Sequence, residues 1–466
     1  MTIQDKAEAV EVEPGVVGKG RWIERWEPEN ELFWENGGKA IAKRNLIFSI
    51  VAEHIGFSVW LLWSIVVVKM YGTFDAETGA LVTAGANGWA LTASQGFTIL
   101  AVASGVGAIL RIPYTFAVGL FGGRNWTVVS ALLLLIPTLA LAWVVQHPEV
   151  PFGVLLAVAA TAGFGGGNFA SSMANISFFY PEKEKGWALG LNAAGGNIGV
   201  AVAQKLVPFA IAAFGIGLAA AGLVYVPLAV AAAILAFLFM DNLRDAKADP
   251  KPTVKSLKEP HTFLMSFLYI GTFGSFIGYS AAFPTLLAVV FGRADIALAW
   301  GFLGALIGSL CRPTGGRLAD RMGGAKVTVA AFTAMAVAGA VAVIGVREES
   351  LLLFFVSFMA LFAFTGIGNG STYRMIPAIF RRRQVEAGED TDESRLDFRR
   401  RAAGAVGIIS AVGALGGFAI PFVYKWAKES SGSIVPALQV YVVVFLVMAA
   451  VTWFAYIRRA AKMSGV

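Results

Sequence analysis

Long apolar runs are the feature that most limits the folds open to this chain. Of its 466 residues, 57% are hydrophobic and only 14% are charged, which excludes an ordinary soluble protein. Twelve runs are long enough to cross a bilayer as helices. They begin near Asn45, Ala93, Trp126, Phe152, Gly186, Ala219, Phe263, Ala294, Val327, Leu351, Ala402 and Val435. The first run follows a charged segment, so it is not a cleaved signal peptide. We expect an all-α membrane protein.

The net charge of +7 invites a nucleic-acid partner, but its distribution argues against one. Lysine and arginine gather before residue 45 and in 244–258, 317–326, 381–401 and 458–462. In a chain of twelve spans, all of these segments fall on one side of the membrane. This is the positive-inside pattern, which predicts that both termini lie in the cytoplasm. We therefore expect a multi-pass protein of the cell inner (cytoplasmic) membrane, in contact with lipid and not with nucleic acid.

A stretch rich in glycine and alanine, 186–199, lies inside one apolar run and carries Asn192 and Asn197. Small residues let membrane helices approach closely, and an amide at bilayer depth needs a polar partner. A second stretch, 405–417, repeats the spacing of the small residues. The matching glycines, which we assign to helix packing or gating, are Gly190, Gly196 and Gly199 with Gly407, Gly413 and Gly416. Related glycine helices half a chain apart are typical of a duplicated transporter fold.

Two further pairs of segments repeat at nearly the same offset. They are 111–123 with 312–324, and 163–169 with 366–372. In the first pair an arginine precedes a Gly-Gly pair by the same spacing in both copies. Three pairs of similar segments, separated by nearly the same number of residues, predict two homologous, pseudo-symmetric bundles of six helices each.

The composition along the chain suggests four parts. Residues 1–44 form a cytoplasmic tail and interfacial segment, 45–240 the first bundle, 241–260 a polar cytoplasmic linker, and 261–466 the second bundle with a short cytoplasmic tail. Tryptophans among the charges before residue 45 suit either a segment lying at the membrane interface or a packed cytoplasmic cap. Residues 384–401 alternate acids and bases, which predicts a solvated loop.

Two arginines lie deep in the predicted spans. Arg111 is ten residues from Phe121, about 15 Å along a helix, and Arg312 is eight from Asp320, about 12 Å. Arginine at such depth costs between about 3 and 17 kcal/mol. A structural ion pair is one solution, but Glu53 is the only clear acid at membrane depth, and one carboxylate cannot neutralise two arginines. We favour an anion shared by both, because the planar guanidinium suits planar oxyanions.

Several of these segments resemble a known family. Residues 168–179, 186–199 and 407–418 resemble the nitrate/nitrite porter (NarK-type) family of the major facilitator superfamily, and the last two match its nitrate signature motifs. Residues 316–324 resemble the superfamily's cytoplasmic loop motif, whose counterpart at 121–124 lacks the acidic residue. The resemblance implies a major facilitator fold of twelve helices that carries nitrate and nitrite. It also implies no enzyme activity, no cofactor and a monomeric carrier.

The resemblance implies a substrate site as well. In the family, paired arginines clasp the anion, an asparagine and a tyrosine bond it, and two aromatic rings stack on it. The residues in these positions are Arg111, Arg312, Asn197, Tyr269, Phe169 and Phe273. Tyr269 and Phe273 are four residues apart and share a helix face, as that role requires. Aromatic side chains at such positions also suit the core of a bundle.

Glu53 and His54 depart from the family's exchangers, which lack ionisable residues in the first helix. Glu53 is eight residues beyond Asn45, about 12 Å deep, and its neighbour points about 100° away. The two residues suit either an interfacial pair solvated from the cytoplasm or a site for protons. A carboxylate that takes a proton would let the empty carrier return. This favours nitrate/proton symport over nitrate/nitrite antiport, with an anion channel or a nitrate sensor as further alternatives.

The remaining reactive side chains predict no second site. Cys311 is the single cysteine, so it makes no internal disulfide, and we interpret it as a small buried residue beside Arg312. His54, His147 and His261 are too scattered to suggest a metal site. We expect no metal and no catalytic residue.

Overall fold

The computed structural model describes residues 20–75, 78–246, 254–386, 388 and 391–458. Within them, twelve segments are long and apolar enough to cross a membrane, which confirms the predicted number of spans. The predicted tail before residue 20 and the middle of the predicted linker lie outside the described residues.

The first six spans form one bundle, and a kink divides most of them into two helices. They contain α2 (Lys39–Trp60) with α3 (Trp63–Val66), α4 (Ala93–Phe121), α5 (Gly123–Leu133) with α6 (Leu135–Val144), α7 (Phe152–Thr161) with α8 (Gly163–Phe179), α9 (Glu182–Phe214), and α10 (Ala220–Leu223) with α11 (Tyr225–Phe239). Helix α2 begins at Lys39, before the predicted start near Asn45, because the backbone is already helical at Gly38 and the charged residues before the apolar run continue that helix.

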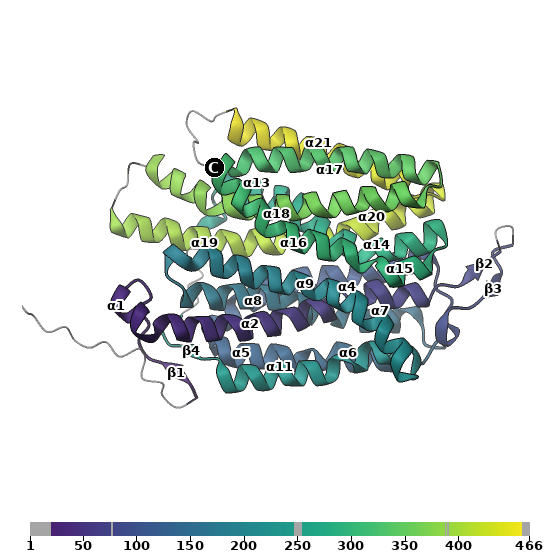
Figure 1. Ribbon diagram of the computed structural model, residues 1–466, viewed down its shortest axis with the longest axis horizontal. Coiled ribbons are helices and arrows are strands. Elements are labelled where there is room, and N and C mark those ends of the chain that lie inside the picture. The colour runs from purple at the N-terminus through teal and green to yellow at the C-terminus, as the bar shows by residue number, and fades with distance from the viewer. Residues whose placement is uncertain (1–19, 76–77, 247–253, 387, 389–390, 459–466) are drawn as a thin grey trace, which may run out of the picture.

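The second six spans form the other bundle. They contain α13 (Pro260–Tyr269) with α14 (Ser275–Phe291), α15 (Ala294–Trp300) with α16 (Phe302–Met322), α17 (Gly324–Arg347), α18 (Leu351–Glu386), α19 (Asp392–Ala414) with α20 (Gly416–Ser431), and α21 (Val435–Thr452). A π-helical turn, Ile270–Gly274, joins α13 to α14. In Figure 1 the first bundle fills the lower half of the molecule and the second bundle the upper half.

The two bundles repeat the same turn at the same place. Gly122 joins α4 to α5 with φ of 87°, and Gly323 joins α16 to α17 with φ of 92°. L-residues with side chains rarely adopt this conformation, so both turns depend on glycine. The duplication predicted from the sequence is therefore also a duplication of backbone geometry.

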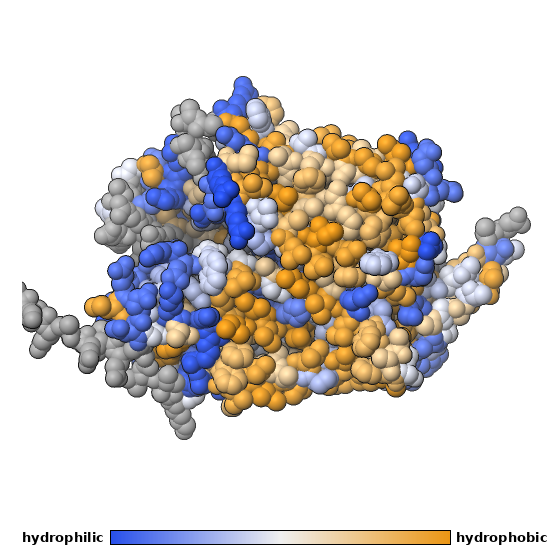
Figure 2. Space-filling view, viewed as in Figure 1, coloured by the Kyte–Doolittle hydropathy of each residue, from blue (hydrophilic) through white to orange (hydrophobic). Residues whose placement is uncertain are grey.

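Short strand pairs mark the two ends of the molecule. Strands β1 (Trp22–Ile23) and β4 (Asn242–Leu243) pair in parallel, and β2 (Thr73–Phe74) pairs antiparallel with β3 (Leu81–Thr83). We call the end with β1, β4 and the α18–α19 connection, at the left of Figure 1, the basic end. The hairpin of β2 and β3 protrudes from the opposite end. Apolar side chains cover the middle of the visible face and polar ones cover both ends (Figure 2), as a membrane protein requires.

The segment before α2 packs on the first bundle. The Trp26 indole donates a hydrogen bond to the Phe179 carbonyl at 3.2 Å. The buried Asp241 carboxylate pairs with Arg21 and with Arg44, each at 2.6 Å. These contacts pack the segment on the first bundle as a cap, and its position at the cytoplasmic membrane interface stays a prediction. Its short helix α1 (Glu31–Phe33) is part of the cap.

The predicted solvated loop at 384–401 is wrong for most of its length. Helix α18 continues to Glu386, and α19 begins at Asp392 after the N-cap Thr391. The alternation of charge that suggested a loop also places opposite charges three or four residues apart, which supports a helix. Asp397 and Arg401 form such a pair within α19. Only a short connection separates the two helices.

Hydrogen bonds join the bundles toward the end opposite the basic end. The hydroxyls of Tyr71 and Thr285 are 3.1 Å apart, and Gln204 Nε2 donates to the Ser280 carbonyl at 2.7 Å. Each bond links a residue of the first bundle to one of the second. In this conformation the two bundles are therefore held together by hydrogen bonds toward the end opposite the basic end.

Candidate functional site

Helix α9 lies directly against α2 because two of its residues are glycines. A methyl group added at Gly196 would lie 2.4 Å from Glu53 Oε1, and one added at Gly199 would lie 2.3 Å from the His54 carbonyl oxygen. Both distances are far below van der Waals contact, so a larger residue would displace the Glu53 side chain at the first position and the α2 backbone at the second. The glycines therefore make room for the first helix and for the carboxylate that it carries.

The second bundle uses its matching glycines in the same way. A methyl group at Gly413 would lie 2.4 Å from the ring of Tyr269, and one at Gly416 would lie 2.5 Å from the backbone of Gly274. These contacts bring α19 and α20 against the seventh span. The predicted role in helix packing fits four of the six glycines.

The other two glycines are less closely packed. No atom lies within 4 Å of a methyl group placed at Gly190, and one placed at Gly407 makes only ordinary contact with Thr115 at 3.5 Å. Gly190 therefore makes no close helix contact with the described residues in this conformation, and its assignment to packing or gating stays a prediction.

Arg111 is fully buried in α4 at the boundary between the bundles. Its Nη1 donates to Ser410 Oγ, in α19 of the second bundle, at 2.8 Å. Its guanidinium carbon is 4.4 Å from the ring centre of Phe169 and 4.8 Å from that of Phe273. The Nε and Nη2 atoms have no hydrogen-bond partner among the described residues. Arg111 thus keeps donors free inside the protein.

Arg312 is buried in α16 of the second bundle, with 5% of its surface exposed. Its guanidinium carbon lies 5.6 Å from the ring centre of Tyr373, and its Nη1 has no partner in the described part of the chain. The charges of Arg312 and Arg111 both act on the Tyr269 hydroxyl and on the Glu53 carboxylate. Neither arginine is in a salt bridge with an acid that would neutralise it, within the described residues.

A row of aromatic rings connects the two arginines. The rings of Phe169 and Phe273 stack with centres 5.8 Å apart, and those of Phe273 and Tyr269 with centres 5.3 Å apart. Tyr373 follows at 6.5 Å from Tyr269. Phe169 and Phe273 face each other directly in this conformation. An anion can enter between these two rings only if they separate.

Asn197 is buried in α9, one residue after Gly196, with 1% of its surface exposed. Its amide nitrogen and oxygen both lack partners among the described residues, and so does the Tyr269 hydroxyl. The structure thus brings five of the six predicted binding residues into one row of contacts. It places Asn197 in α9, the helix whose Gly196 and Gly199 pack against α2.

Glu53 is fully buried in this conformation. Asn192 Nδ2 donates to its Oε2 at 2.9 Å, while Oε1 has no partner in the described structure. His54 is only partly buried, and its Nδ1 is 3.0 Å from the carbonyl oxygen of Gly195 in α9. The two candidates for proton coupling therefore have different surroundings.

Three residues near the arginines were not predicted from the sequence. Tyr373 lies below Arg312, and Trp60, whose indole donates to the Ala103 carbonyl at 3.0 Å, has its ring 5.3 Å from Arg111. Ser410 bonds Arg111 and is the only hydroxyl-bearing residue of the second glycine stretch. That last feature is a sequence signal from which Ser410 could have been found.

Cys311 is partly buried. Its Cβ lies 3.1 Å from the position of a methyl group on Gly366 in α18, so it packs within the second bundle. The interpretation of Cys311 as a small packing residue fits this environment.

Comparison with known proteins agrees with this architecture. Residues 46–389 match the model of the Major Facilitator Superfamily. The chain is 38% identical to the nitrate/nitrite transporter NarU of Escherichia coli, over 93% of this chain and 96% of that protein. It is 39% identical to NarU of Salmonella typhimurium, over 94% and 96%.

The fold also resembles a solved structure. It superposes on a D-xylose-proton symporter with a TM-score of 0.64 at 14% sequence identity, over 88% of this chain and 96% of that one. At this low identity the likeness supports the fold alone. Fold, signature motifs and relatives agree: this chain belongs to the nitrate/nitrite porter family of the major facilitator superfamily.

Proposed function

We propose that this protein carries nitrate, with nitrite as a second substrate, across the cytoplasmic membrane by secondary active transport. The relatives named as nitrate/nitrite transporters support this substrate class. The mechanism needs no cofactor and no covalent step. By the positive-inside rule, the basic end of the molecule faces the cytoplasm, and a single chain contains both halves of the site.

The observation that carries the proposal is a group of buried donors without partners at the boundary of the bundles. Arg111 Nε and Nη2, Arg312 Nη1 and the Tyr269 hydroxyl lack hydrogen bonds within the described residues. A buried donor left unpaired costs about 1–3 kcal/mol, and more when it is charged. A planar oxyanion accepts several such bonds at once and neutralises one positive charge. Nitrate has this shape and charge.

Charge counting favours proton symport. Two guanidiniums and the Glu53 carboxylate give the empty site a formal charge of +1, because +2 and −1 sum to +1. Adding one nitrate and one proton leaves that charge unchanged. The empty and the fully loaded carrier therefore present the same charge to the membrane, so both can change conformation at similar electrostatic cost. An exchanger with two arginines and no carboxylate would hold +2 when empty, which opposes the return of the empty carrier.

Alternating access supplies the movement. The bonds between Tyr71 and Thr285 and between Gln204 and Ser280 join the bundles on the side opposite the basic end. The close contacts of Gly196, Gly199, Gly413 and Gly416 each lie within one bundle, so each bundle can move as one body. We propose that breaking the bonds between bundles on this side lets them rock about the arginine site.

The direct test is flux through purified protein in vesicles. Nitrite-free vesicles with an inward proton gradient should accumulate nitrate above the external concentration. Accumulation only into nitrite-loaded vesicles, without regard to the gradient, would instead identify an antiporter. Flux at channel rates would support an anion channel, and nitrate binding without flux would support a sensor.

A further inference from the structure

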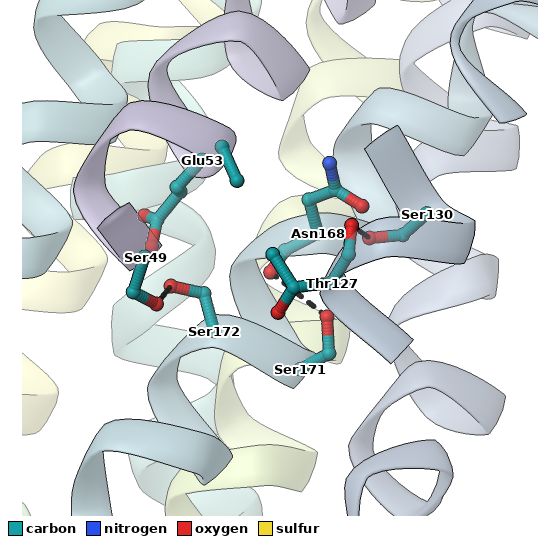
Figure 3. Close-up of a pocket in the computed structure, with 8 residues that line it drawn as sticks. Ser49, Glu53, Thr127, Ser130, Asn168, Ser171 and Ser172 are labelled. Carbon is teal, nitrogen blue, oxygen red and sulfur yellow. Dashed lines mark hydrogen bonds between the residues drawn. The ribbon is translucent and has the colours of Figure 1, made fainter. Parts of the chain in front are cut away.

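A polar cavity lies inside the first bundle, apart from the boundary with the second bundle. It is enclosed by α2, α5 and α8, with Glu53 on its wall (Figure 3). The other polar side chains that line it are Ser49, Thr127, Ser130, Asn168, Ser171 and Ser172. Figure 3 shows Glu53, Ser49 and Ser172 on one side of the cavity and Asn168, Thr127 and Ser171 on the other. A membrane protein rarely gathers so many polar groups between three helices without a function.

Two side chains on the cavity wall have polar atoms without a hydrogen-bond partner among the described residues. Glu53 Oε1 has no hydrogen bond, and neither does the Nδ2 or the Oδ1 atom of Asn168, among the described residues. Both side chains are at least nine-tenths buried. Buried polar atoms of this kind usually bond ordered water. The volume open to the centre of a water molecule is about 10 Å³, which is room for roughly one water.

Polar side chains on the helices that line the cavity continue from Glu53 toward the basic end. Ser49 precedes Glu53 by one turn of α2, about 6 Å nearer that end. Thr127 lies four residues after the start of α5 at the basic end, again about 6 Å by the helical rise. One turn beyond Ser171, the buried Asn175 packs against Gly123 at this start, and its Nδ2 also lacks a partner in the described structure. Polar groups therefore continue from Glu53 almost to the surface.

We propose that water in this cavity carries the proton between Glu53 and the basic end, so that proton and anion leave the protein by different routes. The inference rests on the proposed function, which makes Glu53 the proton site. Serine and threonine hydroxyls both donate and accept hydrogen bonds, as a chain of proton transfers requires. The anion leaves between the bundles, past the arginines.

The charges around Glu53 fit this division. The positive charges of Arg111 and Arg312 act on its carboxylate, and both arginines lie on helices other than those that enclose the cavity. The cavity itself has neutral hydroxyls and amides and no cationic side chain on its wall. With room for roughly one water molecule and no cation on its wall to pair with nitrate, the cavity admits water and excludes the anion.

The test removes cavity hydroxyls while keeping the anion site. In Thr127→Val with Ser130→Ala, each lost hydroxyl bonded only a carbonyl of its own helix, Gly123 and Thr127 respectively, so folding should change little. Thr138→Val is the matched control, because Thr138 makes the same type of bond to Leu134 in α6, outside the cavity. Both proteins are reconstituted in vesicles and assayed for nitrate uptake driven by a proton gradient, and for nitrate/nitrite exchange without one.

We expect proton-driven uptake to fall about tenfold in the cavity variant, and exchange in both variants to stay within about twofold of the parent. Equal losses in both assays, or proton-driven uptake equal to that of Thr138→Val, would overturn the route. If the parent protein shows proton-driven uptake and the cavity variant matches it, the proposed function stands and only the route is lost. If the parent shows no proton-driven uptake, both the proposed proton symport and the proton route through the cavity are wrong.

Discussion

Matching glycines in the two bundles pack against side chains of different chemical type. In the first bundle Gly196 makes room for the Glu53 carboxylate, and in the second the matching Gly413 makes room for the Tyr269 ring. The distance from the added methyl group is 2.4 Å in both cases. The backbone geometry is the same in both bundles, but the side chain that faces the glycine is a carboxylic acid in the first and a phenol in the second.

The neighbours of these side chains differ accordingly. Asn192 donates to the Glu53 carboxylate, and the residue that matches Asn192 in the second bundle is Ile409. Tyr269 instead stacks on Phe273 and lies next to the arginines. This difference is what the proposed function expects, with a proton site in the first bundle and an anion ligand, Tyr269, in the second. Each bundle supplies one arginine.

The largest loss of nitrate uptake should come from changing the arginines, of which each bundle supplies one. Arg111→Lys and Arg312→Lys keep the charge but lose the planar fork. One charge-assisted hydrogen bond is worth about 1.5–3 kcal/mol, so each variant should lose roughly 10- to 100-fold in nitrate uptake. Uptake rates in vesicles measure this. A loss in only one of the two variants would show that the clasp is not symmetric, and near-normal uptake in both would remove it.

A smaller and unequal effect should follow from filling the two glycine positions. In Gly413→Ala the methyl group meets a rigid ring, whereas in Gly196→Ala it meets the flexible end of a carboxylate. We expect a loss of uptake of roughly tenfold for Gly413→Ala and a few-fold for Gly196→Ala, because only the carboxylate can turn away cheaply.

Gly190→Ala and Gly407→Ala are the matched controls for these variants. Both positions accept a methyl group in this conformation, and alanine stabilises a helix by about 1 kcal/mol relative to glycine. Uptake close to that of the parent is expected. Losses as large as that of Gly413→Ala would mean that these glycines pack closely in another conformation of the carrier.

Much of this architecture was predictable because it follows from the duplication. Apolar length predicts the spans, and the repeated register predicts the two arginines near the boundary of the bundles. The partners of the arginines were harder to predict. Ser410 meets Arg111 only because two helices from different bundles cross there, and no spacing within the chain encodes that crossing. Tyr373 is an ordinary aromatic residue until the fold places it beside Arg312.

Two differences between sequence pattern and structure have a common cause. Gly190 matches the spacing of the packing glycines, but among the described residues no atom lies within 4 Å of a methyl group placed there in this conformation; 384–401 has the composition of a loop but is mostly helical. In both cases a local pattern was read without knowing which surfaces the fold brings together. Spacing predicts which residues share a face, and the tertiary structure decides whether that face is covered.

The smallest effect is expected for His54. Its Nδ1 bonds the Gly195 carbonyl, so it contributes to the contact between α2 and α9 and lies apart from the arginines. His54→Ala should lower proton-driven nitrate uptake by about twofold, the effect of one ordinary hydrogen bond, and should keep its dependence on the gradient. Loss of that dependence with intact exchange would move the proton site from Glu53 to His54.

The central claim is that Glu53 couples proton movement to an anion site that works without it. The most direct test is Glu53→Gln, which keeps the shape of the side chain and removes the titrating group. The variant and the parent are reconstituted in nitrite-free vesicles with an inward proton gradient, and in nitrite-loaded vesicles without one. The account predicts that the variant no longer accumulates nitrate in the first assay and exchanges nitrate for nitrite like the parent in the second. Accumulation by the variant equal to that of the parent in the first assay would contradict it.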